Sequence, residues 1–518
     1  MKKSVLIALA AVIVCGVGYL ALTPDGGGSS SEEAQPAQVQ ENAKYKDTIV
    51  FCQGNDLVTM DIITGIQERS IALTNNIFES LFGFDDALNV VPVLAEEYEW
   101  LDGKSLKVKI RSGVKFHDGS EMTARDVKYT MDSIDEAGTL FAGSYDRTDV
   151  VDDHTVVIRM KQTSPTLLNL LAAAYAGIVP EKARSADPKA FGQHPIGTGP
   201  YKLQEFQEGD YYKLERFDDY WRGPAKTKYL VMRIVPESSQ RQILVETGDV
   251  DVAYEIHPSV IARVKDNPDM KILTSDSTKI ISLHINVGSN GPLGNVLVRK
   301  AIMHAIDKQA IIDNLLAGYG EATVSMIPVG AKDYVVQEDY KYDIETAKNL
   351  MKEAGYENGF ETVLWVDSNQ TNTETAQFIQ NQLAQIGIKV SIVVQDPNTT
   401  FSLIKAGADF GMILDFFNLS TGHGDLVFKR MLYSTSNSNW CNYKNPDYDK
   451  AYDEYSCTPE GEERMKRLEK INSYFLNDVP VVSLYNEKKI ILANSSFEGL
   501  KLSRSGWHNY YNATVAEK

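Results

Sequence analysis

The chain has 518 residues, more than one hydrophobic core can organise, so we expect about two to four domains. Hydrophobic residues make up 43% of the chain and aromatic residues 9%, which is typical of folded domains and argues against a disordered protein. With 52 basic and 70 acidic residues the formal net charge is -18, and because an acidic surface repels phosphate backbones, nucleic acid is not an expected partner.

The N-terminal residues carry the pattern of an exported protein. Residues 1–24 are predicted to be an export signal or a membrane anchor, because two lysines precede an apolar run at residues 5–22. Residues 25–45, rich in Gly, Ser, Glu and Gln, are predicted to be a flexible linker. Cys15 has the position of a lipoprotein-box cysteine, but Val14 before it is larger than such boxes usually allow. Lipid attachment, a retained helix and signal cleavage all remain open.

The folded part is predicted to begin with a strand at residues 47–52 and a helix at residues 67–81. At residues 111–119, Arg-Ser-Gly-Val-Lys-Phe-His-Asp-Gly reads as a strand that ends in glycine turns. A helix should follow, because Thr123 is a good N-cap and Asp126 occupies the reciprocating third position. This segment therefore mixes α and β structure.

A tight bend is predicted at residues 195–203, Pro-Ile-Gly-Thr-Gly-Pro-Tyr-Lys-Leu. Its closely spaced glycines and prolines fix a backbone path that few other sequences could adopt. We therefore expect Gly197 and Gly199 to serve the fold and not a ligand. The same is expected of His117, whose ring should bond nearby backbone.

A second region begins near residue 286. Residues 299–316 carry apolar side chains at helical spacing and are predicted to form a helix. The clearest unit follows, with a strand at 361–366, a helix at 373–386 and a strand of alternating apolar residues at 388–394. This βαβ crossover predicts a pair of parallel strands.

Together and in this order, the runs at 111–126 and 195–203 resemble the family 5 extracellular solute-binding proteins, the receptors of peptide and nickel ABC importers. Further matches to the family are Asp-Tyr-Trp-Arg-Gly at 219–223, Glu-Thr-Gly-Asp-Val-Asp at 246–251 and the run at 292–308. The resemblance implies an α/β, two-lobed periplasmic-binding-protein-like fold of the type II, large peptide-binding subclass. Mixed sheets and a hinge between the lobes are part of that expectation.

The resemblance also implies a domain organisation and a function. Lobe 1 would comprise residues 46–285 and be completed by residues 486–518, and lobe 2 would comprise residues 286–485. The protein would be the substrate-binding component of an ABC importer that encloses a peptide-like solute and delivers it to the permease subunits in the membrane. We expect a monomer at the outer face of the cytoplasmic membrane or in the periplasmic space, held by its N-terminal anchor.

Motifs of catalysis and metal binding are missing from the sequence. It contains no His-Glu-x-x-His, no Cys-x-x-Cys, no phosphate-binding loop and no Gly-x-Ser-x-Gly. We therefore expect no enzyme, no cofactor and no bound metal, although an extracytoplasmic peptidase is kept as an alternative. A nickel or metal-chelate receptor is the other alternative, with His423 in Gly422-His423-Gly424 as its candidate ligand; that His is expected to lie solvated in a glycine-rich loop.

Ligand contacts are expected from loops at the ends of strands. Asp415 ends an apolar strand and precedes two aromatic residues, an arrangement suited to a cation held beside ring faces. For Trp365 a core position and a pocket position are both open. The candidate ligand-binding residues are Asn55, Asp56, Trp365, Asp367, Asn369, Asp415, Phe416 and Phe417.

Two positions depart from the family pattern. Dipeptide-binding members hold the ligand carboxylate with an Arg in the loop that corresponds to residues 366–369, and this chain has no Arg there. They hold the ligand amine with an Asp at the point where this chain has Leu419 or Ser420. An ordinary dipeptide is therefore not the expected solute. Longer or modified peptides, or another cationic solute, remain open.

Cysteine spacing allows one disulfide in an oxidising compartment. A bridge between Cys441 and Cys457 is predicted, and closing this short loop would contribute about 3 kcal/mol. Cys52 is expected to be a small buried apolar residue.

Overall fold

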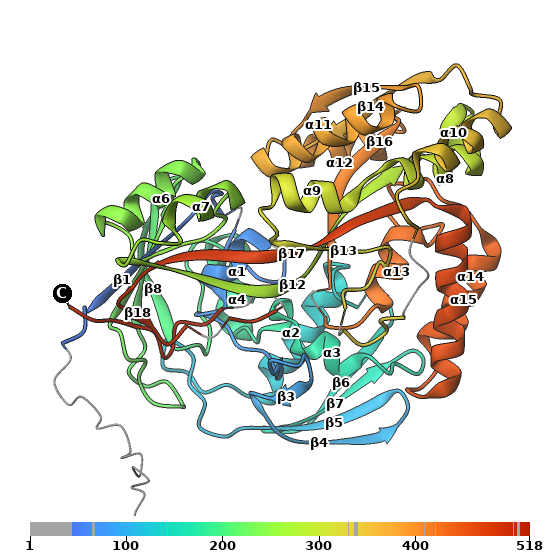
Figure 1. Cartoon of the computed structure of the whole chain (residues 1–518). Coiled ribbons are helices and arrows are strands. Elements are labelled where there is room, and N and C mark those ends of the chain that lie inside the picture. Colours follow the sequence, from blue (N-terminus) through green and yellow to red (C-terminus); the bar gives the residue numbers. More distant parts are fainter. Residues whose placement is uncertain are drawn as a thin grey trace, which may run out of the picture. The chain divides into compact units, whose positions relative to one another are not determined.

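The computed structural model describes residues 44–57, 59–64, 68–141, 143–329, 331–335, 340–408, 410–419, 421–500, 502–504 and 508–517 (Figure 1). The predicted export segment and nearly all of the predicted linker lie outside these residues. Of the helices in the described part, none has the length and apolar character needed to cross a membrane.

A large mixed sheet runs through residues 44–518. Its strand order is β15-β14-β16-β12-β17-β11-β1-β10-β9-β8, with β13 paired to β17. The strands are β1 (Thr48–Gln53), β8 (Tyr201–Gln207), β9 (Tyr211–Arg216), β10 (Tyr229–Ile234), β11 (Val252–Ala253), β12 (Met270–Ile285), β13 (Gly320–Ala322), β14 (Phe360–Val366), β15 (Ile388–Val394), β16 (Met412–Asn418) and β17 (Val481–Asn494).

Strands β12 and β17 are long enough to join the two halves of this sheet (Figure 1). Near Met270, β12 pairs with the end of β17 that adjoins β11, and near His284 it lies between β17 and β16. The pairing shifts register between Asp276 and Ile280, so the ladder is irregular midway. There the Asn486 amide donates to the backbone carbonyls of Ser277 and Lys279, at 2.9 and 2.8 Å.

Parallel pairing occurs in both halves of the sheet. In the β16 half, β14 pairs in parallel with β15 and with β16, and helix α11 (Gln370–Ala384) makes the crossover from β14 to β15. The predicted βαβ unit is confirmed. In the β1 half, β1 lies between β10 and β11 and is parallel to both.

Smaller sheets complete the described strands. The β4-β5-β7-β6 sheet packs against α2 (Ala124–Glu136), whose predicted capping box is present: the carboxylate of Asp126 accepts from the Thr123 backbone N–H at 2.8 Å. The other two small sheets are the pairs β2-β3 and β18-β19. The strands of the three small sheets are β2 (Phe82–Phe84), β3 (Val90–Pro92), β4 (Ala95–Asp102), β5 (Ser105–Ile110), β6 (Tyr145–Asp152), β7 (Thr155–Met160), β18 (Phe497–Glu498) and β19 (Thr514–Val515).

Two predicted helices are shorter than expected. The one predicted at 67–81 is α1 (Glu68–Thr74), which ends at Thr74. The one predicted at 299–316 is divided into α8 (Val296–Ala305) and α9 (Lys308–Leu315), because Asp307 caps α9 by accepting from Ala310 N–H at 2.9 Å. The remaining helices of the described part are α3 (Leu167–Ala172), α4 (Glu181–Ala186), α5 (Pro188–Phe191), α6 (Ser238–Thr247), α7 (Ile261–Val264), α10 (Ile344–Glu353), α12 (Pro397–Lys405), α13 (Asp425–Leu432), α14 (Pro446–Ser456), α15 (Glu462–Asp478) and the 3-10 turns η1 (Ala174–Ala176), η2 (Pro258–Val260) and η3 (Pro292–Gly294).

The bend at 195–203 explains why the first helix ends early. Gly199 N–H donates to the carbonyl of Ile77 at 2.8 Å, so the chain after Thr74 pairs with the bend. His117 lies against the same bend, with Nε2 at 3.0 Å from the carbonyl of Gly199 and Nδ1 accepting from Gly197 N–H at 3.3 Å. Burial lowers the pKa of His117 to about 4. Its predicted backbone-bonding role is confirmed.

The predicted disulfide is wrong, because Cys441 and Cys457 are both free thiols. Cys441 is buried in a hydrophobic cluster, with its Sγ 3.7 Å from Nδ1 of His284. Cys457 lies at the end of α14, and its thiol donates to the carbonyl of Asp453 at 3.1 Å, back along its own helix. The two thiols therefore have different partners. Cys52 is buried as expected.

Candidate functional site

Parallel strands β14 and β16 bring two acidic residues together. The prediction that Asp415 ends its strand is wrong, because β16 continues to Asn418 through its pairing with β12. Trp365 of β14 pairs with Ile413 of β16, so Asp367 and Asp415, two residues further along each strand, lie at the same level. Strand β15 is parallel to β14 on its other side, with Val394 opposite Val366. Strands β14 and β15 both end at this level, and the carboxyl ends of parallel strands are where α/β folds place their ligands.

Asp415 is half-buried, and its ionisation is strongly perturbed. Burial is the main cause that raises the pKa of its carboxyl group to about 7, and the negative charge of Asp367 adds to the effect. A backbone hydrogen bond from Phe416 and the positive charges of Lys279 and Arg430 act in the opposite direction. Perturbed carboxyl groups of this kind are concentrated at functional sites.

Asp367 and Asn369 shape the start of helix α11. The Asp367 carboxylate accepts from Asn369 N–H at 3.1 Å and from the Asn372 amide at 3.0 Å. Asn369 is the N-cap of α11 and accepts from Asn372 N–H at 3.2 Å. Both residues therefore have local structural partners beside Asp415.

The aromatic candidates differ in exposure. Trp365 is 7% exposed and packs on Phe410 with ring centroids 5.2 Å apart, a core position. Phe417 is also buried, whereas Phe416 is half-buried. Above the Phe416 ring lies Nζ of Lys279, 4.3 Å from its centroid, and this ammonium is 3.2 Å from Glu487. The cation on this ring is thus one of the protein's own.

Asn55 and Asp56 belong to the other half of the sheet, directly after β1. Asp56 accepts from Gly209 N–H at 2.7 Å and from the Tyr212 hydroxyl at 2.8 Å, so it supports the loop between β8 and β9. Asn55 is exposed.

No pattern in the sequence indicated a polar contact between the segment after β11 and helix α11. His257, which follows β11, has Nε2 at 3.1 Å from the carboxylate of Glu374 in α11. The two residues are far apart in sequence and neither belongs to a motif, so no sequence signal pointed to them.

Comparison with known proteins identifies the family. Residues 89–439 match the sequence model of the bacterial extracellular solute-binding proteins, family 5 Middle. The chain belongs to family 5. This confirms the predicted family and, with the neighbours below, the two-lobed α/β fold. The family consists of extracellular solute-binding proteins.

Relatives of this family 5 chain include the glutathione-binding protein GsiB of Pectobacterium atrosepticum, 31% identical over 490 residues that span 91% of this chain and 95% of the relative. Among solved structures, DppA from Helicobacter pylori in complex with the peptide STSA has a TM-score of 0.82 at 23% identity, with 91% of this chain and 99% of that chain covered. NikA from Staphylococcus aureus with Ni(L-His)2 has a TM-score of 0.81 at 21% identity, covering 90% and 99%. Both structures show the shared fold.

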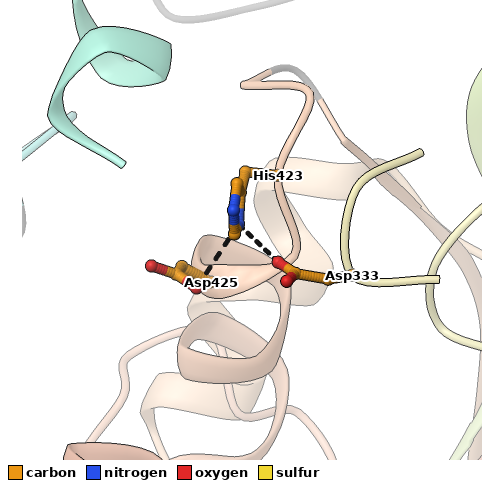
Figure 2. A group of neighbouring side chains, drawn as sticks. All are labelled: Asp333, His423 and Asp425. Carbon is orange, nitrogen blue, oxygen red and sulfur yellow. Dashed lines mark ion pairs between the residues drawn. The ribbon is translucent and has the colours of Figure 1, made fainter. Parts of the chain in front are cut away.

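A buried group of charges lies elsewhere in this family 5 protein (Figure 2). His423 is 1% exposed and its Nδ1 faces Asp333 and Asp425, while its Nε2 lies 3.2 Å from Glu460. Although burial alone would lower it, the pKa of His423 is raised well above its usual value by these three carboxylates. The expectation of a solvated His423 is therefore wrong.

Arg464 completes this group, which we call the charge cluster: Asp333, His423, Asp425, Glu460 and Arg464. Its guanidinium contacts Asp425 Oδ1 and lies 3.8 Å from Asp333. The donors of Asp333, His423 and Asp425 lie within 4.8 Å of one another, close enough to hold a metal ion. However, Arg464 contacts the same Asp425 oxygen that faces His423, so two cationic side chains already neutralise both carboxylates. The geometry is that of an ion-pair cluster.

Proposed function

We propose that the protein is the extracytoplasmic substrate-binding component of an ABC importer. It captures a peptide-like solute between two lobes and delivers it unchanged to the permease subunits, without catalysing a reaction. It works as a monomer, anchored by residues 1–24 outside the cytoplasm. Membership of family 5 supports the receptor role, and the names of its relatives include glutathione and peptide ligands.

The lobes that we propose are residues 46–285 with 486–518, and residues 286–485. The distribution of the hydrophobic cores supports this division. One core contains residues from Ile49 to Val252 together with residues from Ile491 to Val515, and another contains residues from Ile281 to Tyr485. Between them, β12 and β17 supply the connection at which the lobes would move.

Asp415 is the observation that carries our proposal for the solute. It offers a half-buried carboxyl within β16, beside Asp367, which directly follows β14. The nearby Lys279 is engaged by Glu487 and Phe416. A site with this excess of negative charge selects a cationic group, such as the free amine of a peptide. The absence of an Arg at residues 366–369 argues against a short dipeptide clamped by its carboxylate.

Asp415→Asn should weaken binding of an amine-bearing peptide roughly tenfold to hundredfold, because a charge-assisted hydrogen bond in a desolvated site is lost. Wild-type affinity should also rise as the pH increases through about 7, where Asp415 ionises, and the variant should lack this rise. Calorimetric titration with a free-amine peptide and its N-acetylated form measures both effects.

Asp56→Asn is the matched control. It replaces one of the two carboxylate oxygens that accept from Gly209 and Tyr212, and should lower the melting temperature with little change in affinity. Equal dissociation constants for wild type and Asp415→Asn would remove Asp415 from the site. Titration with Ni(II)-histidine in the same experiment distinguishes the metal-chelate receptor.

A further inference from the structure

Two leucines, one from each proposed lobe, pack against hydrophobic residues of the opposite lobe. Leu88, in the turn between β2 and β3, is 2% exposed and belongs to the same hydrophobic cluster as Met326, Ile327 and Val427 of lobe 2. Leu426, in α13 of lobe 2, packs against the main core of lobe 1. Each lobe therefore inserts an apolar side chain into the other.

The turn that contains Leu88 holds this residue in an unusual backbone conformation. Leu88 has φ of 63°, a left-handed conformation that is unfavourable for a leucine and that Gly or Asn would adopt more easily. The Asp85 carboxylate fixes the turn by accepting from the backbone N–H groups of Ala87 and Asn89, at 2.9 and 2.8 Å. The contacts of the Leu88 side chain with the apolar residues of lobe 2 explain why a leucine occupies this position.

Polar contacts surround the two leucines. Thr166, which precedes α3, donates to the Asp425 carboxylate at 3.1 Å, and the Asn169 amide donates to the carbonyl of Thr421 at 3.1 Å. Both donors are buried. In addition, a Cβ on Gly422 would lie 3.2 Å from the Phe84 ring, so the loop before α13 approaches β2 closely.

The charge cluster holds the lobe 2 side of this contact in place (Figure 2). Asp333 accepts from Gly424 N–H at 3.0 Å, and Arg464 of α15 contacts Asp425. The segments around residues 333 and 421–425 are thereby fixed to each other and to α15. Lobe 2 presents a preformed surface to Leu88, Thr166 and Asn169.

We propose that these residues form a closure latch, which stabilises the closed form of the receptor and so sets its affinity without touching the solute. The latch consists of Leu88, Thr166 and Asn169 on lobe 1 and Thr421, Asp425 and Leu426 on lobe 2. The inference rests on the proposed function, in which the lobes separate to admit the solute. The apparent dissociation constant scales inversely with the fraction of closed protein, so loss of the latch weakens binding.

The test uses Leu88→Asn, which keeps a residue tolerant of positive φ and removes the apolar side chain, and Thr166→Val, which removes one hydrogen bond at nearly constant size. Leu101→Asn, at a position 48% exposed on β4, is the control. The probe is a peptide that wild type retains from a mixture of two to five residues in length. We expect Leu88→Asn to raise the dissociation constant about tenfold, mainly through faster dissociation, with a smaller change for Thr166→Val.

A purely structural role for Leu88 would lower the melting temperature and leave the dissociation constant and dissociation rate at wild-type values, and that result would overturn the latch. Hydrogen exchange of residues 421–428 in solute-free protein separates this failure from a failure of the proposed function. If wild type retains no peptide, the proposed function is wrong, and faster exchange in Leu88→Asn than in Leu101→Asn would still support the contact. Unchanged exchange would reject it.

Discussion

Gly197→Val should prevent the protein from folding cooperatively. A Cβ at this position would lie 2.0 Å from the carbonyl oxygen of Ile77 and 2.8 Å from its carbonyl carbon. Both are backbone atoms that cannot move aside without breaking the hydrogen bond from Gly199 N–H to Ile77. We expect a loss of more than about 4 kcal/mol in the free energy of unfolding. Urea denaturation followed by circular dichroism measures it.

A matched pair of alanine variants isolates the steric effect. Gly197→Ala should be strongly destabilised, whereas Gly291→Ala, whose Cβ would meet nothing closer than 3.6 Å, should melt near wild type. If Gly197→Val folded with a normal melting temperature and only lost its ligand, Gly197 would belong to the binding site and not to the fold.

Arg464→Met should lower the free energy of unfolding by about 3–5 kcal/mol, because it leaves Asp333 and Asp425 buried with one cationic partner fewer. Arg464 is 1% exposed, and it also donates to the carbonyls of Tyr455 and Thr458 at 2.9 Å. Arg467→Met on the same helix removes only part-exposed ion pairs and should cost less than about 1 kcal/mol. Similar unfolding curves for the two variants would contradict the structural role of the charge cluster.

The charge cluster also predicts how stability depends on pH. Because the folded pKa of His423 is raised, its contribution is complete below about 6.5, its unfolded value, and is lost as the pH rises through the folded value. The folded pKa of Asp425 is lowered, since His423 and Arg464 outweigh its burial, so its contribution is lost in acid. His423→Gln should therefore remove the alkaline loss of stability that wild type shows.

Local patterns in the sequence predicted much of the fold. The capping box at Thr123 and the βαβ unit around α11 rest on contacts within short segments, which the sequence displays directly. Helix ends were harder, because Thr74 ends α1 where distant residues of the 195–203 bend pair with the chain. His423 was misjudged for the same reason: its glycine neighbours suggested exposure, whereas its burial depends on Asp333 and Arg464 far along the chain.

The candidate site was predictable only in part. Asp367 follows the end of β14 as predicted, whereas Asp415 was expected to end a strand that in fact continues to Asn418. Parallel pairing in the structure brings the two residues to one level. The position of Lys279 at the site could not be predicted from the sequence, because its contact with the Phe416 ring depends on the pairing of β12 with β16. Strand-end position alone also cannot separate Asp415 from Asp56, whose partners Gly209 and Tyr212 come from a different hairpin.

Native mass spectrometry of the full-length protein with a mixture of peptides two to five residues long tests the central claim most directly. A solute-binding receptor should retain a peptide with a free amine, at one peptide per chain, and should release it with its mass unchanged. Recovery of cleaved peptides would show an enzyme, and retention of no peptide from the mixture would contradict the proposed function.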